Sequence, residues 1–133
     1  MLVSGDETGG GYTVFQSIVS PGGPPLHTHT REDENFYIVE GEVTFTIAGR
    51  TAVARAGDLA HAVKNVQHTF TNKTSRPAKM LVTAIPAGID RMFFEIGEVL
   101  APGATTPAPM TEAAIAKVIE ACPRYSIVLA PPA

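Results

Sequence analysis

The stretch His27-Thr28-His29-Thr30-Arg31-Glu32-Asp33-Glu34 decides how this chain is interpreted, and Gly41 follows it after a short, mostly apolar run. Side chains alternate between the two faces of a strand, so His27 and His29 share a face if the segment is extended. Neutral imidazole together with carboxylate is a usual ligand set for first-row divalent metals that keep open positions. Glu34 supplies such a carboxylate a few residues after the two histidines.

A third histidine, His68, lies farther along the chain within another β-like segment. We predict that four side chains hold one divalent metal ion: His27, His29, Glu34 and His68. Two plainer interpretations stay open. Each histidine could be an ordinary surface or turn residue, and Glu34 could be merely one of three acids in a polar loop at residues 32–35.

Composition limits the possible partners and surroundings. The chain has 133 residues and a formal net charge of −3, with no cluster of Lys or Arg, so nucleic acid and anionic membranes are not expected partners. No apolar run approaches the length of a membrane span, and the polar, glycine-rich start does not read as a signal peptide. Cys122 is the single cysteine, which excludes an intrachain disulfide and suits a reducing, cytoplasmic location.

Hydrophobic periodicity predicts eight or nine short strands over residues 12–86, separated by turns rich in glycine and proline, as in a β-sandwich or barrel. Residues 43–47 alternate most clearly, with Val43, Phe45 and Ile47 on one face. We expect the acids at 32–35 to form a loop before a strand at 36–39. Residues 1–11 read as a loose arm.

The last third of the chain changes character. The pattern predicts a short helix over residues 90–100, with Met92, Phe93, Ile96 and Leu100 on one stripe, and then a linker over 101–109. A second helix is expected to start at Thr111, whose hydroxyl can cap it, and to end at Pro123. Its predicted apolar stripe consists of Ile115, Val118, Ile119 and Cys122. Residues 125–129 are expected to add a final strand or to dock on the barrel.

With both histidine segments described, the chain resembles the cupins. The first motif of that family is matched by His27, His29, Glu34 and Gly41, and the second by Gly57, His68 and Asn72. Val63 and Asn65 stand where the second motif has proline and glycine, and Pro21 stands where the first has its leading glycine. Asparagine tolerates the left-handed backbone conformation better than most residues, so the turn at Asn65 can survive.

The resemblance implies an all-β fold: a double-stranded β-helix, or jelly-roll, barrel over about residues 12–86, with a C-terminal helical arm over about 87–133, in one domain of residues 1–133. It also implies one divalent metal ion, which could be Fe, Mn, Ni, Co, Cu or Zn. The run 36–41 and the tail resemble small single-domain cupins of the quercetin 2,3-dioxygenase-like type. That likeness implies a dioxygenase for a small flavonol-like or enol-bearing substrate, with Glu34 as both metal ligand and catalytic base.

Other interpretations remain open at this point. The metal could serve a non-redox isomerase or lyase, or the barrel could bind a small molecule without catalysis. Phe36, Phe70 and Met92 are the expected pocket residues, although each could simply fill the core. We interpret His61 as structural or as a neighbour of the ligands. We also expect a homodimer, with the N-terminal arm and C-terminal helix at its interface.

Overall fold

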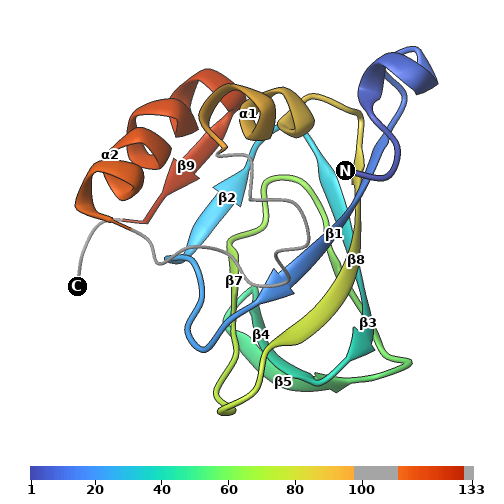
Figure 1. Ribbon diagram of the computed structural model, residues 1–133, viewed down its shortest axis with the longest axis vertical. Coiled ribbons are helices and arrows are strands. Elements are labelled where there is room, and N and C mark those ends of the chain that lie inside the picture. Colours follow the sequence, from blue (N-terminus) through green and yellow to red (C-terminus); the bar gives the residue numbers. More distant parts are fainter. Residues whose placement is uncertain (98–110, 131–133) are drawn as a thin grey trace.

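Two antiparallel sheets lie face to face in a computed structural model that describes residues 1–97 and 111–130 (Figure 1). One sheet has the strand order β1-β8-β3-β6 and the other has the order β5-β4-β7-β2-β9. The strands are β1 (Thr13–Val19), β2 (His27–His29), β3 (Asp33–Glu40), β4 (Glu42–Ile47), β5 (Arg50–Arg55), β6 (Leu59–Ala62), β7 (His68–Thr71), β8 (Ala78–Ile85) and β9 (Ile127–Leu129). The predicted all-β barrel architecture is confirmed.

The main core lies between the two sheets and follows the alternation of the strands. Along β8, Ala78, Met80, Val82 and Ala84 are buried while the residues between them are less so. On β4, Val43 and Phe45 point inward, as predicted, with Ile47 packed against the same cluster. Period-two burial is what a sheet with one face on the core requires. For residues 43–47, the sequence pattern therefore predicted which side chains share the inner face.

A second apolar cluster joins one end of the barrel to the helices α1 (Ile89–Ile96) and α2 (Glu112–Ala121) (Figure 1). Its buried members are Ala84, Ile89, Met92, Ala121, Cys122 and Ile127. The predicted cap is confirmed, because the Thr111 hydroxyl accepts the Ala114 N–H at 3.1 Å. Among the described helices, none combines the length and the apolar character that crossing a membrane would require.

Two predictions about the C-terminal region need correction. Ile115 and Ile119 are not buried, since they are 44% and 53% exposed. Val118 is partly buried and Cys122 is buried in the cluster between the barrel and the helices, so only half of the predicted apolar stripe is covered. The helix ends at Ala121, and Pro123 lies in the following 3-10 turn η2 (Cys122–Tyr125). The first helix ends at Ile96, and Leu100 and the linker at 101–109 lie outside the described residues.

The prediction that Glu34 lies in a loop is also wrong. Strand β3 begins at Asp33, and Glu34 pairs with Ala84 of β8 on one side and with Ala62 of β6 on the other. Both alanines are almost fully buried. The acids at 32–35 were polar enough to suggest a loop, but pairing on both sides holds this segment in the sheet. Tertiary context overrides local polarity here.

The turn between β3 and β4 supplies a prediction about stability. Gly41 has a φ of +85°, and a Cβ placed on it would lie 2.9 Å from Ala78 Cα. Gly49 has a φ of +78° but nothing within 4 Å. Gly49→Ala should therefore cost only the strain of the left-handed conformation, about 1 kcal/mol. Gly41→Ala should cost about 2 kcal/mol more, because the backbone of β8 must also move.

Urea unfolding of the two variants beside the wild type measures this difference. Equal losses of stability would show that the contact with Ala78 relaxes at no cost.

Candidate metal centre

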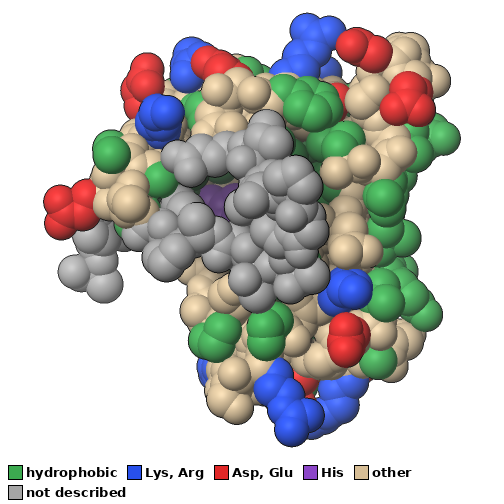
Figure 2. Space-filling view, in the orientation of Figure 1, with side chains coloured by type: hydrophobic (Ala, Val, Ile, Leu, Met, Phe, Trp, Pro, Cys, Tyr) green, Lys and Arg blue, Asp and Glu red, His purple; other side chains and the backbone are tan. Residues whose placement is uncertain are grey.

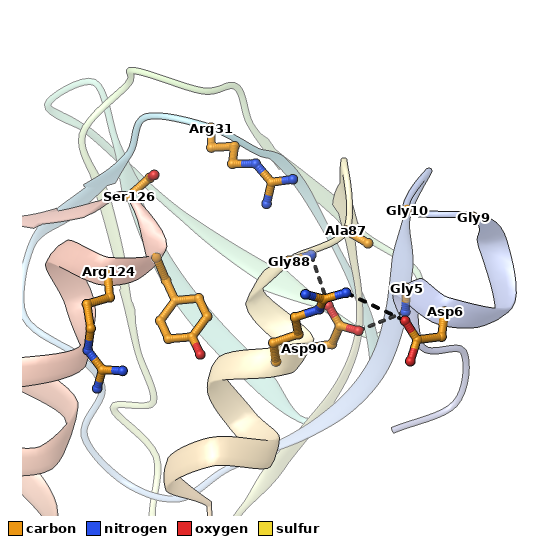
Figure 3. A pocket seen from close by; sticks show the side chains of 12 residues that line it. Gly5, Asp6, Gly9, Gly10, Arg31, Ala87, Gly88, Asp90, Arg124 and Ser126 are labelled. Carbon is orange, nitrogen blue, oxygen red and sulfur yellow. Dashed lines mark hydrogen bonds and ion pairs between the residues drawn. The ribbon is translucent and has the colours of Figure 1, made fainter.

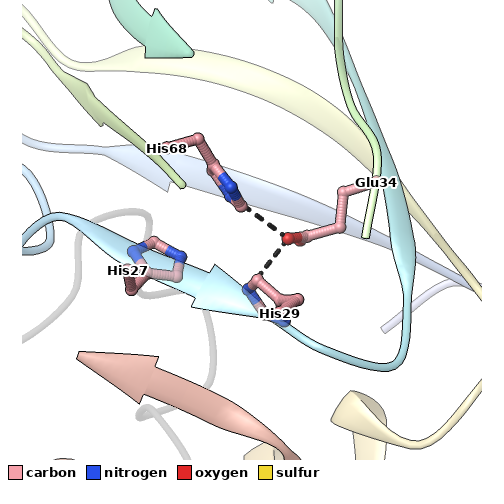
Figure 4. Close-up of side chains that lie close together, drawn as sticks. All are labelled: His27, His29, Glu34 and His68. Atoms are coloured by element: carbon pink, nitrogen blue, oxygen red, sulfur yellow. Dashed lines mark ion pairs between the residues drawn. The ribbon is translucent and has the colours of Figure 1, made fainter. Parts of the chain in front are cut away.

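Four side chains from three strands meet at one end of the barrel (Figure 4). Strand β2 carries His27 and His29, β7 carries His68 and β3 carries Glu34. His27 stands directly opposite His68 in the β2–β7 ladder, which brings these two distant segments together. One potential ligand atom from each side chain lies within 4.8 Å of all the others. The structure therefore brings together all four residues that the sequence singled out.

The second ring nitrogen of each histidine is held by an acceptor. The Nδ1 atom of His27 lies 2.8 Å from the Pro25 carbonyl oxygen, and that of His68 lies 3.3 Å from the Val66 carbonyl oxygen. His29 Nδ1 instead lies 2.7 Å from a carboxylate oxygen of Glu32. A proton on Nδ1 that is donated to such an acceptor leaves the Nε2 lone pair free for a metal.

Burial and charge shape the cluster further. His27, His29, Glu34 and His68 are 9%, 4%, 4% and 1% exposed, and a small patch of histidine surface is visible on the face shown in Figure 2. Burial alone would lower the pKa of His29, but the carboxylates of Glu32 and Glu34 outweigh it and raise that pKa to about 9. Burial would raise the pKa of Glu34, but His29 and His68 outweigh it and lower that pKa to about 2.

Glu34 is therefore an anion, and a positive charge is needed beside it. Its Oε1 atom lies 2.9 Å from His29 Nε2 and 3.4 Å from His68 Nε2. Without a metal ion, the additional proton on the His29 ring supplies that positive charge. His27 differs from His29, because burial is the largest effect on its pKa and lowers it. Metal binding would replace the proton on His29, since ligating imidazoles are neutral.

Two buried atoms at the centre fit an additional partner. When each histidine carries its single proton on Nδ1, Glu34 Oε1 and His68 Nε2 have no hydrogen-bond partner within the described part of the chain, although both are shielded from solvent. Buried polar atoms are nearly always paired. Three imidazole nitrogens and a carboxylate form a donor set that suits several first-row divalent metals. The residues present could therefore hold one such ion, and this donor set is compatible with each of the metals considered above.

The other predicted residues fall in different places. The Phe36 ring is 2% exposed and its centroid lies 6.0 Å from that of His68. Phe70 packs against Phe36, with centroids 5.8 Å apart. Met92 lies instead in the cluster between the barrel and the helices. His61 is exposed on β6 and its Nδ1 is hydrogen-bonded to Asn35 of β3, so it lies outside the group of four.

The sequence interpretation missed the role of Glu32. It treated this residue only as one of the neighbouring acids, yet the Glu32 side chain is 1% exposed and contacts His29 directly. A charged side chain is seldom buried unless it is paired. The sequence spacing could have indicated this role, because an acid three residues after a histidine ligand can reach the ring nitrogen that does not bind the metal.

The profile of the Cupin domain family matches residues 15–84, which is more than half of the chain. The chain therefore belongs to the cupin family. It is 32% identical over 72 residues to Beta-D-galactosidase Rv1717 of Mycobacterium tuberculosis, a match that covers 54% of this chain and only 62% of that relative.

Solved structures show the same fold. A predicted oxalate decarboxylase from Thermotoga maritima is 25% identical, with a TM-score of 0.61 over 64% of this chain and 76% of its own. An RmlC-like cupin from Shewanella frigidimarina is 26% identical, with a TM-score of 0.55 over 62% of this chain and 72% of its own.

Proposed function

We propose that this cupin is a metal-dependent dioxygenase for a small organic molecule that carries an enol or a flavonol-like oxygen donor. The observation that supports it is the convergence of four donor atoms within 4.8 Å, with every histidine oriented through its Nδ1 atom. Such a set leaves coordination positions for further ligands. A bound metal would supply a site that orients the substrate and dioxygen.

The protein's own residues have separate tasks in this proposal. His27, His29 and His68 bind and orient the ion, and Glu34 completes the set. In this proposal Glu34 also accepts a proton from a substrate hydroxyl. Because the Glu34 backbone is paired on both sides, the carboxylate moves through rotation about its side-chain bonds rather than through motion of its backbone.

The surroundings of the site favour a substrate with a flat, apolar part. Phe36, Phe45 and Phe70 form a group of aromatic rings with centroids 5.2 to 5.8 Å apart, and Phe36 adjoins His68. The remaining buried members of this cluster are aliphatic. These rings belong to or pack against the buried core beside the centre, and their apolar character supports a substrate with an apolar part. A polyanion would find few partners in such a setting.

A non-redox reaction is the second candidate, and the comparisons favour it. The predicted oxalate decarboxylase and the Beta-D-galactosidase named above suggest decarboxylation or cleavage rather than oxygenation. A bound metal could act there as a Lewis acid. Non-catalytic capture of a small molecule is the third possibility. Homodimer formation stays a prediction, supported by the exposed apolar side chains Ile115, Ile119 and Val128.

An oxygen-uptake screen tests the proposal. Protein reconstituted in turn with Fe, Mn, Ni, Co, Cu and Zn is expected to consume oxygen with flavonols or related enols for at least one metal. His68→Asn removes a predicted ligand and should abolish uptake. His61→Asn is its matched control and should leave uptake unchanged, because His61 is exposed on β6. Turnover that persists without oxygen would support the non-redox candidate, and tight binding without turnover would support simple capture.

A further inference from the structure

A polar hollow lies apart from the four predicted metal ligands (Figure 3). It has a volume of about 610 Å³ and is formed by four segments: the 3-10 turn η1 (Gly5–Thr8) with the glycines after it, the β2–β3 connection, the start of α1, and the junction of η2 with β9. None of the four predicted metal ligands lines it. Its size is within the range of small-molecule sites.

Among the described residues, the two acids that line this hollow are already engaged. Asp90 is 3% exposed, and its carboxylate accepts the N–H groups of Gly5 at 2.7 Å and Gly88 at 2.9 Å. Asp6 faces Arg91 across 3.7 Å, but both side chains are mostly exposed. An exposed pair of this kind is weak and is easily rearranged.

Three arginines line the hollow, and Arg31 differs from the other two. Arg124 pairs with Glu95, and Arg91 pairs with Asp6. For Arg31, no carboxylate within residues 1–97 or 111–130 comes within ion-pair distance. Its positive charge is therefore left without an acidic partner in the described part of the fold, at the edge of a polar hollow.

The Arg31 guanidinium lies against the backbone of Gly88. A Cβ placed on Gly88 would lie 1.9 Å from Arg31 Nη1, so the guanidinium packs directly on the glycine. Figure 3 shows Arg31 reaching into the space between Ser126 and Gly88. This packing is available only because position 88 has no side chain.

We propose that this hollow binds a small anion with a carboxylate or phosphate group, and that the Arg31 guanidinium is its principal ligand. The planar fork of arginine matches the paired oxygens of both groups. Ser126 lines the same hollow and adds a hydroxyl. The proposal does not depend on the metal centre, because it uses none of the four residues there.

Calorimetric titration with inorganic phosphate and, separately, with succinate tests the proposal and distinguishes the two classes of anion. Chloride is used to keep the ionic strength constant. Arg31→Gln is expected to weaken binding of the preferred anion about tenfold. Arg76→Gln is the matched control, since it makes the same change of charge at another exposed arginine, and it should change the affinity less than about twofold.

Several outcomes would overturn the proposal: no binding of either anion to the wild type up to about 10 mM, or equal effects of the two substitutions. If Arg31→Gln does not fold, Arg31→Lys decides, because it keeps the charge but loses the planar fork. Severalfold weaker binding by that variant supports the site, and unchanged affinity contradicts it. Repeating the titration with Glu34→Gln excludes anions that bind at the metal centre instead.

Discussion

Glu34→Gln is expected to lower the affinity for divalent metal by more than about 100-fold, because the substitution removes the single carboxylate among the four predicted ligands. Glu34 Oε1 lies within 3.4 Å of two imidazole nitrogens, so an amide there brings no negative charge to the centre. Equilibrium dialysis followed by elemental analysis, together with the absorbance of bound Co²⁺, measures the loss.

The control for this variant is on the same strand. Glu40 ends β3, and its side chain is 72% exposed, so Glu40→Gln makes the same chemical change without touching the centre. It should keep the metal content of the wild type. If Glu34→Gln also kept that content, the assignment of Glu34 as a ligand would be wrong, and the dioxygenase proposal would lose its catalytic base as well.

Glu32→Ala is expected to weaken metal binding by about 10- to 100-fold, the usual cost of removing the group that orients a metal-bound histidine. A Glu32 carboxylate oxygen lies 2.7 Å from His29 Nδ1 and can accept its proton. The Nδ1 atoms of His27 and His68 face backbone carbonyl oxygens instead. We infer that Glu32 is a positioning residue for His29. Glu32→Gln should recover part of the affinity, because its amide oxygen still accepts the Nδ1 proton.

Asp33→Asn is the matched control for Glu32. Asp33 is the next residue, but its carboxylate accepts the Lys64 N–H at an exposed position, so metal affinity should hardly change. Two measurements separate a positioning role from a loss of structure. A reoriented His29 changes the absorbance spectrum of bound Co²⁺, whereas a loss of structure lowers the thermal unfolding temperature of the metal-free protein. An unaltered spectrum and affinity in Glu32→Ala would remove the positioning role.

Much of the fold could be predicted from local patterns. Alternation located β4 nearly to the residue, because the period-two pattern is a property of the strand by itself. The Thr111 cap was predictable for the same reason, since it depends on neighbours within one turn. The histidine spacing on β2 predicted that two imidazoles share a face, and His68 was predicted as a third ligand from its residue type before the second motif supported it.

Other features depended on which distant segments pair. Polarity alone placed Glu34 in a loop, whereas its pairing with both β6 and β8 makes it part of a rigid strand. The last strand, β9, was expected only as an addition to the barrel, and the structure pairs it with β2, the strand that carries two of the predicted ligands. No periodicity in the chain specifies such a partner, because pairing is chosen by the packing of the whole sheet.

The sequence by itself determined the all-β class, the face that Val43, Phe45 and Ile47 share and the four side chains suited to a metal. The tertiary structure alone decided the burial of Glu32 against His29, the exposure of Ile115 and Ile119, and the approach of Arg31 to Gly88. The physical reason is the same in each case: a local pattern states which side chains share a face, whereas burial and charge pairing depend on what the rest of the chain places against that face.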